Sequence, residues 1–164
     1  MKNLGKVFEQ NFRKSIPDSK DIYYYRLKDS ASSYYGGNAN LRFSQNNIAD
    51  AFLFHVTEYM NNLLILEFKS HKGKSLPISC IRENQLKEMV EAGKKSQVIP
   101  LLVVFFSDIE RCFSLNIKDV DNFIKNSGRK SIPLEYFEQS AIEINVTKLR
   151  TNYKYDVEEW LNNI

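Results

Sequence analysis

Residues 98–106, Val-Ile-Pro-Leu-Leu-Val-Val-Phe-Phe, form the feature that most restricts how this chain can fold. A run of this length, rich in β-branched and aromatic residues and bounded by polar segments, is typical of a strand. Side chains of a strand alternate between two faces, so a strand that is apolar throughout must be covered on both. The run therefore predicts a buried strand inside a sheet with helices packed on it.

Other patterns along the chain complete an α/β arrangement with a mixed central sheet flanked by helices. The residues at 60–62, Met-Asn-Asn, lie between two apolar runs and predict the turn of an antiparallel hairpin. Residues 28–45, rich in Ser, Gly and Asn, predict a long polar loop, for which contact with DNA and disorder are both open. Helices are predicted at 4–16, 81–92, 118–126 and 157–163, a turn or helix begins at Pro133, and strands are predicted at 22–27, 48–56, 63–70, 98–106, 111–115 and 142–146.

The composition narrows the class of protein. The 164 residues, 43% of them apolar, fit a single domain spanning 1–164. The 23 Lys and Arg against 20 Asp and Glu leave a net charge of only +3, which does not by itself indicate nucleic acid. No apolar run approaches the ~20 residues that span a bilayer and the N-terminus has no signal region, so we expect no membrane contact and a cytoplasmic protein. Cys80 and Cys112 lie far apart, which predicts reduced and mostly buried thiols.

Two charged residues interrupt the apolar strand 63–70. Alternation places Glu67 and Lys69 on one face, whereas Leu66 and Phe68 point to the other. The apolar neighbours indicate a central strand, where a charged side chain rarely lies without a partner. A metal ion would supply that partner, and an exposed charged edge is the simpler alternative.

Asp50 is a second acid embedded among apolar residues, in the sequence Ile-Ala-Asp-Ala-Phe near the start of the preceding strand. Magnesium prefers carboxylate oxygens and retains water ligands, so Asp50 and Glu67, helped by the Phe68 carbonyl, could hold it. Lys69 would then orient the attacking hydroxide or stabilise the transition state of phosphodiester hydrolysis. The alternative is a buried or edge ion pair without catalysis, which generally costs stability.

The register of the hairpin decides whether the two acids meet. A tight turn at Asn61-Asn62 pairs Glu67 with Val56 rather than with Asp50. We therefore expect a bulge or an offset to bring Asp50 and Glu67 together.

Two helical residues are expected near the same region. In the helix 81–92, Gln85 lies on the apolar arc and faces inward. Its amide needs partners, which a metal, its waters and a phosphate would supply, or which the backbone would supply at the edge of the core. In the helix 4–16, Glu9 falls next to Ile16 at the margin of the apolar arc, where its carboxylate can lean toward the core.

These residues belong to a longer pattern. It runs Gly-Lys-Val-Phe-Glu at 5–9, Asn-Ile-Ala-Asp at 47–50, Leu-Glu-Phe-Lys-Ser at 66–70, Gln-Leu-Lys-Glu-Met at 85–89, and the apolar strand at 101–106. The acid at 50 followed by Glu-Phe-Lys at 67–69 resembles the PD-(D/E)xK nuclease motif, with Ala49 where the motif name has Pro. The whole succession, over residues 4–116, resembles the RecU-type Holliday junction resolvases and their phage-encoded relatives. Residues 55–62 are too short for the stalk that bacterial RecU proteins insert between strands.

The resemblance implies a restriction-endonuclease-like core at about residues 4–116 with a C-terminal extension at 117–164. It implies that Asp50 and Glu67 ligate Mg²⁺, for which Mn²⁺ can substitute, and that Lys69 is the catalytic lysine. Glu9 would support the water shell of the metal, and Gln85 would lie near the active site. It also implies a homodimer that nicks two symmetric strands of a four-way junction, in the host cytoplasm if the chain is encoded by a phage.

A few basic residues are candidates for contact with DNA phosphates. His71, Lys72 and Lys74 directly follow the strand 63–70 and, with Lys69, form a local basic cluster or a solvated turn. Arg42 lies in the predicted loop.

Aromatic residues at both ends of the chain have two readings each. Of Tyr23, Tyr24 and Tyr25, at least one must belong to the core, because consecutive side chains of a strand face both ways, and the others could stack on bases. Trp160 is expected to anchor the final helix or to take part in a dimer contact.

The leading hypothesis is thus a magnesium-dependent, structure-selective DNA endonuclease that resolves Holliday junctions or related branched DNA. A duplex or single-strand DNA nuclease of restriction or repair type would use the same chemistry. A non-catalytic DNA-binding protein that assists recombination is the alternative from another class. Asp50, Glu67 and Lys69 argue against it, because a binding module does not need two acids and a lysine in an apolar hairpin.

Overall fold

The computed structural model describes residues 4–27 and 47–164, so the loop predicted at 28–45 and its Arg42 lie outside the described residues. None of the helices in the described ranges is long and apolar enough to cross a membrane. The elements follow one another in the order α1 (Leu4–Ser15), β1 (Ile22–Arg26), β2 (Ala51–Val56), β3 (Asn61–His71), β4 (Ser75–Pro77), η1 (Ile78–Cys80), α2 (Glu83–Ala92), β5 (Val98–Phe106), β6 (Arg111–Asn116), α3 (Ile117–Ser127), β7 (Ser131–Pro133), α4 (Leu134–Ser140), β8 (Ile142–Ile144), β9 (Val146–Lys148), β10 (Tyr153–Tyr155) and α5 (Val157–Asn162).

Six strands form the main sheet, in the order β1-β2-β3-β5-β6-β8. Strands β3 and β5 run parallel, and every other neighbouring pair is antiparallel. A parallel pair needs a crossover connection, and the segment from β4 through α2 supplies it. The mixed α/β sheet predicted from the sequence is confirmed.

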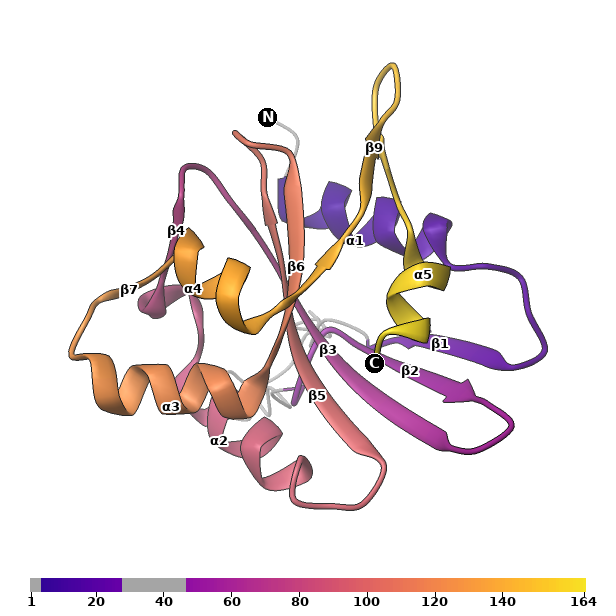
Figure 1. The fold of residues 1–164 in the computed structure, drawn as a ribbon, viewed down its shortest axis with the longest axis horizontal. Helices are drawn as coiled ribbons and strands as arrows, with labels where there is room; N and C mark the ends of the chain where they lie inside the picture. Colours follow the sequence, from indigo (N-terminus) through magenta and orange to yellow (C-terminus); the bar gives the residue numbers. More distant parts are fainter. Residues whose placement is uncertain (1–3, 28–46) are drawn as a thin grey trace, which may run out of the picture.

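Helices cover both faces of this sheet, as the apolar run at 98–106 requires. Helices α1 and α5 lie on one side, and α2, α3 and α4 lie on the other (Figure 1). The side chains of β5 alternate between the two resulting cores. Leu101, Val103 and Phe105 pack with α1 and α5, whereas Leu102, Val104 and Phe106 pack with the other three helices.

The last helix is held by a buried tryptophan. Trp160 is 1% exposed, and its indole Nε1 donates a hydrogen bond to Ser114 Oγ at 2.7 Å. Its ring lies edge-on to Phe12 of α1, with the ring centroids 5.6 Å apart. Of the two readings of Trp160, the structure therefore shows the anchor of the final helix.

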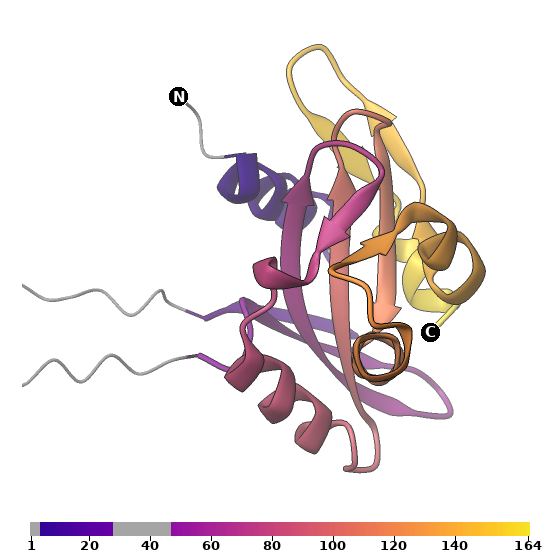
Figure 2. The same ribbon diagram turned by 90° about the vertical axis from the view of Figure 1, so that its left-hand side faces the viewer.

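Some local expectations need correction. The strand predicted at 142–146 divides, because the carbonyl of Asn145 accepts a hydrogen bond from the Asp156 N–H at 2.9 Å and the chain leaves the main sheet there. The following β9 and β10 form a separate hairpin that projects from the upper end of the molecule in both views (Figures 1 and 2). Cys112 is buried as expected, but Cys80 is exposed.

Candidate active site

The β2–β3 hairpin turns at residues 57–60, earlier in the chain than the predicted turn at 60–62. The Thr57 N–H and hydroxyl both donate to the Met60 carbonyl, at 2.8 and 2.9 Å, and the Met60 N–H donates to the Thr57 hydroxyl at 2.9 Å. The predicted turn at Asn61-Asn62 is therefore wrong, because these hydrogen bonds close the chain before it, and both asparagines lie in β3.

This register brings Asp50 to Glu67. Ala51 pairs with Leu66, and the Asp50 N–H also donates to the Leu66 carbonyl at 3.0 Å. Two consecutive residues thus lie opposite one residue of β3, which is an irregularity of the bulge type. The Asp50 carboxylate then accepts a hydrogen bond from the Phe68 N–H at 2.8 Å, so the acid lies beside the strand that carries Glu67.

Glu67 is held on both sides. It is 3% exposed, and its Oε1 lies 2.6 Å from Lys69 Nζ on the same face of β3. Its Oε2 accepts a hydrogen bond at 2.6 Å from Gln85 Nε2, which comes from α2. The structure therefore brings one acid, the lysine and the glutamine into direct contact. Gln85 bonds to the acid, and its predicted role toward a metal, its waters and a phosphate stays a prediction.

The electrostatics of Glu67 reflect this environment. Its pKa is raised to about 7, first by burial and next by the negative charge of Asp50, while Lys69 acts in the opposite direction. Two carboxylates close together at a buried position resist ionisation together, and a bound cation removes that penalty. A perturbed acid with a charged neighbour is a common mark of a functional site.

The residues present fit a hard divalent cation. In the parts of the chain that the structure describes, no three Asp, Glu, His or Cys side chains converge on one point, so two carboxylates need additional oxygen ligands. The Phe68 carbonyl is one candidate, because in a strand the C=O and N–H of one residue point the same way, and this N–H points to Asp50. Gln85 Oε1 is buried and has no hydrogen-bond partner among the residues that the structure describes, so it can accept a bond from a metal-bound water.

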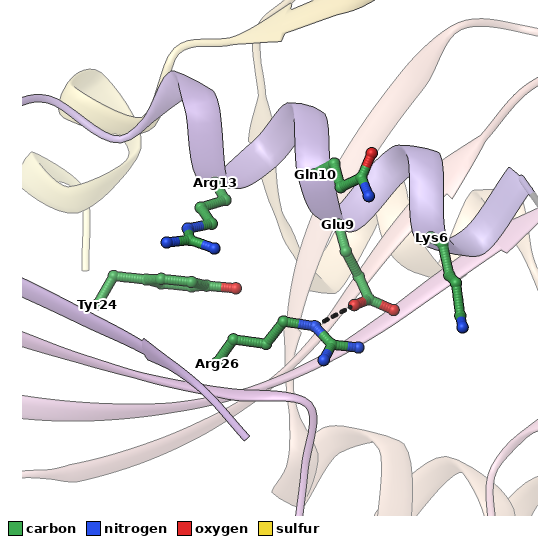
Figure 3. Close-up of a pocket in the computed structure, with 6 residues that line it drawn as sticks. All are labelled: Lys6, Glu9, Gln10, Arg13, Tyr24 and Arg26. Atoms are coloured by element: carbon green, nitrogen blue, oxygen red, sulfur yellow. Dashed lines mark hydrogen bonds and ion pairs between the residues drawn. The ribbon is translucent and has the colours of Figure 1, made fainter. Parts of the chain in front are cut away.

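Glu9 forms an ion pair with an arginine of β1. Its Oε2 is 3.1 Å from Arg26 Nε at the end of β1. The two residues line a pocket of about 300 Å³ between α1 and β1, together with Lys6, Gln10, Arg13 and Tyr24 (Figure 3). Sequence patterns did not point to Arg26, because its partner lies 17 residues away in another element.

Tyr24 lines this pocket, and its hydroxyl feels the charges of two acids, Glu9 and Asp50. Burial raises the pKa of Tyr24 to about 12, and the charges of Glu9 and Asp50 add to the increase. Both acids therefore lie close enough to Tyr24 to act on its hydroxyl. The predicted role of Glu9 in a water shell stays a prediction.

The predicted basic cluster lies at the end of β3. Lys72 and Lys74 are exposed and flank Gly73, whose N–H donates to Asp108 Oδ2 at 2.9 Å and whose φ is +82°. A left-handed φ favours glycine at this turn. His71 is half-buried, and its carbonyl accepts the N–H of the residue at 107 at 2.9 Å. The structure thus shows a fixed, solvent-facing basic turn next to Lys69, and contact with DNA stays a prediction.

The fold and the site together define the class of protein. A mixed sheet with an acid at the start of one strand and Glu-x-Lys in the next has the PD-(D/E)xK nuclease fold. The sequence profile of the family described as RecU, recombination protein U, matches residues 55–159, and the chain belongs to this family. The match contains Glu67, Lys69 and Gln85, and begins after Asp50.

A prophage protein is similar over almost the whole chain. The SPbeta prophage-derived protein YotM of Bacillus subtilis (strain 168) is 31% identical over 168 residues, which cover 93% of this chain and 82% of the relative. The resemblance stated from the sequence motifs is confirmed at the level of the family.

Proposed function

We propose that this chain is a magnesium-dependent, structure-selective DNA endonuclease that cuts Holliday junctions or related branched DNA. Membership of the RecU family supports a resolvase-type nuclease. One structural observation carries the chemical part: Glu67, 3% exposed, is hydrogen-bonded to Lys69 and Gln85 and lies within the field of Asp50. A structural ion pair would not need the second acid.

Asp50, Glu67 and the Phe68 carbonyl would hold the metal, with Gln85 Oε1 and Glu9 acting through its waters. Such a donor set, made of oxygens with few carboxylates, suits Mg²⁺, and Mn²⁺ can substitute. The bound ion would lower the pKa of a water and neutralise charge on the scissile phosphate.

Lys69 lies between the buried acid and solvent. Its side chain is 22% exposed, whereas the side chain of Glu67 is 4% exposed, so the ammonium group is on the side from which a phosphate would approach. From there it can neutralise charge that develops on the phosphate or orient the attacking water. Its contact with Glu67 keeps the long side chain in place before the substrate arrives.

Exposed basic residues beyond Lys69 suggest how the protein would bind its DNA substrate. Lys72 and Lys74 are exposed beyond Lys69 and would bind phosphates flanking the cut, with His71 and Arg42 as further candidates. A homodimer would place two such sites on two symmetric strands of a junction. We propose that the protein acts in the cytoplasm, and that its substrate is branched or duplex DNA.

Cleavage of a labelled four-way junction with Mg²⁺, measured beside linear duplex and single strands of the same sequence, tests this proposal. We expect the junction to be cut fastest, and we expect Glu67→Gln and Lys69→Ala to lose at least about 100-fold in rate. Glu83→Gln is the matched control, because this acid lies on α2 with its side chain 79% exposed.

Each contrary result is informative. Equal cutting of all substrates would remove the junction claim and leave a general nuclease of restriction or repair type. Binding of the junction without cleavage in any of several divalent ions would favour the non-catalytic accessory protein. Full activity of Glu67→Gln would refute the proposed site.

A further inference from the structure

Exposed aromatic side chains lie on the two strands at the β1 edge of the sheet. Tyr23 is 64% exposed, Tyr25 45% and Phe54 40%. Tyr24, between the two tyrosines, points the other way and packs against the core beneath α1 and α5. The tyrosine that belongs to the core is thus Tyr24, and its two neighbours face solvent.

The exposed tyrosines share a face with the candidate active site. Tyr25 pairs with Phe52, and Phe52 pairs with Ile65 of β3. Residues directly opposite one another in antiparallel strands point to the same face, and so do residues two apart in one strand. Ile65 and Glu67 are two apart, so Tyr25 points to the same side of the sheet as Glu67.

The distance along the strands to the acids is short. The Leu27 N–H donates to the Asp50 carbonyl at 2.8 Å, so the end of β1 lies beside Asp50. Tyr25 is two residues before Leu27, or about 7 Å along the strand, and Tyr23 is about 7 Å further. Phe54 lies directly opposite Tyr23. Strands β1 and β2 extend away from α2 and α3, so this face continues past the helical layer (Figure 1).

We propose that Tyr23, Tyr25 and Phe54, here called the aromatic face, stack on unpaired bases of the DNA strand that enters the active site. The inference rests on the proposed function, because the metal site fixes where the strand lies. Aromatic rings arranged along a strand can stack on successive bases of any sequence, since every base has a π-face. The aromatic face therefore selects DNA in which the bases next to the cut are unpaired.

Position and charge both favour a DNA strand as the occupant over a second copy of the chain. The aromatic face shares one side of the sheet with Glu67, and the strand that carries Glu67 leads on to the exposed Lys72 and Lys74, which would bind the phosphates of a DNA strand. Tyr23 and Tyr25 lie about 7 Å apart along β1, so the aromatic face offers stacking positions for about two bases.

Photochemical coupling in metal-free buffer with EDTA tests this directly. Single-stranded oligonucleotides and junctions would carry one 5-iodouracil at each position in turn, and irradiation links this base to an aromatic ring stacked on it. We expect crosslinks to Tyr25 and Tyr23, identified by mass spectrometry, from neighbouring positions only. Crosslinks confined to other aromatic residues would overturn the proposal.

Affinity measurements provide a second, independent readout. We expect Tyr23→Leu and Tyr25→Leu each to weaken binding of single strands about tenfold, the loss of one stacked base, and Tyr→Trp at either position to retain binding. Leu149→Ala, at another exposed apolar position, is the control. Unchanged affinity of the leucine variants would contradict the proposal. A change from dimer to monomer with unchanged affinity per protomer would assign the face to contacts between copies.

The outcome separates this inference from the proposed function. Crosslinks to the two tyrosines in a protein that does not cut DNA would contradict the nuclease activity alone. Cleavage of junctions without these crosslinks would contradict the aromatic face alone.

Discussion

The side-chain amide of Gln85 donates from Nε2 to Glu67 Oε2 at 2.6 Å, and this hydrogen bond joins α2 to the buried acid of β3. The other oxygen of the same carboxylate contacts Lys69. Both oxygens are thus oriented by the protein itself, before any ligand binds. A preoriented carboxylate loses less conformational freedom when it binds a metal, so under the proposed function Gln85 would prepare Glu67 to act as a ligand.

Replacing Gln85 by Ala should therefore impair the site. Glu67 Oε2 would lose its donor at a buried position, so we expect the cleavage rate to fall about 10–100-fold and unfolding to become easier by about 1–3 kcal/mol. Mg²⁺ titrations of the cleavage rate and urea unfolding measure the two effects. Glu83→Ala, on the exposed face of the same helix, should change neither by much. If both variants had the same cleavage rate and the same free energy of unfolding, Gln85 would not be needed to position Glu67.

The stability of the metal-free protein should depend on pH through Glu67. Its pKa is raised from the ordinary 4.5 to about 7, so its contribution to stability is fully present below pH 4.5. As the pH rises from 4.5 through about 7, the unfolded chain loses this proton first, which favours unfolding. We expect a loss of about 1–3 kcal/mol over this range. Urea unfolding in EDTA should show the loss in wild type and a flatter profile in Glu67→Gln, and equal profiles would contradict it.

Magnesium should compete with this proton. A divalent cation binds the ionised form of Glu67, whose pKa is about 7, so its affinity should rise between pH 6 and pH 8. The increase in melting temperature on adding Mg²⁺ should accordingly be larger at pH 8. Calorimetric titration at several pH values measures the affinity. Asp50→Asn should remove most of the increase in melting temperature that Mg²⁺ causes. A Mg²⁺ affinity that is the same at pH 6 and pH 8 would exclude Glu67 as a ligand.

Trp160 should be among the most sensitive positions of the core. Trp160→Ala removes a large buried side chain and leaves Ser114 without its donor, so we expect a loss of about 3–5 kcal/mol in the free energy of unfolding. Trp160→Phe should retain part of the packing and cost less. Chemical denaturation of both variants checks the order, and Leu149→Ala, which is 49% exposed, should stay within about 0.5 kcal/mol of wild type. A neutral Trp160→Ala would show that α5 does not anchor on the sheet.

Periodicity predicted the long elements well because each carries its own signal. The run at 98–106 coincides with β5, and the helical patterns locate α1, α2 and α3 to within two residues. The short strands β4 and β7 carry no such signal, since each has three residues and exists because the chain brings the two segments together. Non-local pairing of this kind lies outside what local patterns encode.

The site was only partly predictable for a similar reason. Strand alternation alone placed Glu67 and Lys69 on one face, and the helical arc pointed Gln85 inward. The hairpin register depended instead on Thr57, whose hydroxyl closes the turn at Met60, while the asparagine pair that is typical of turns lies in the strand. Contact between Glu9 and Arg26 depends on how α1 lies against the sheet edge, which no local pattern specifies.

A crystal structure with Mn²⁺, using its anomalous scattering, tests the central claim most directly. We expect one strong peak bounded by a carboxylate oxygen of Asp50, a carboxylate oxygen of Glu67 and the Phe68 carbonyl, with Gln85 Oε1 and Glu9 close enough to accept bonds from its waters. Lys69 would then lie beside the ion rather than against Glu67 Oε1. A fully occupied Mn²⁺ elsewhere, or none at the acid pair with Glu67 still bonded to Lys69 and Gln85, would contradict a metal-dependent nuclease site at Asp50 and Glu67.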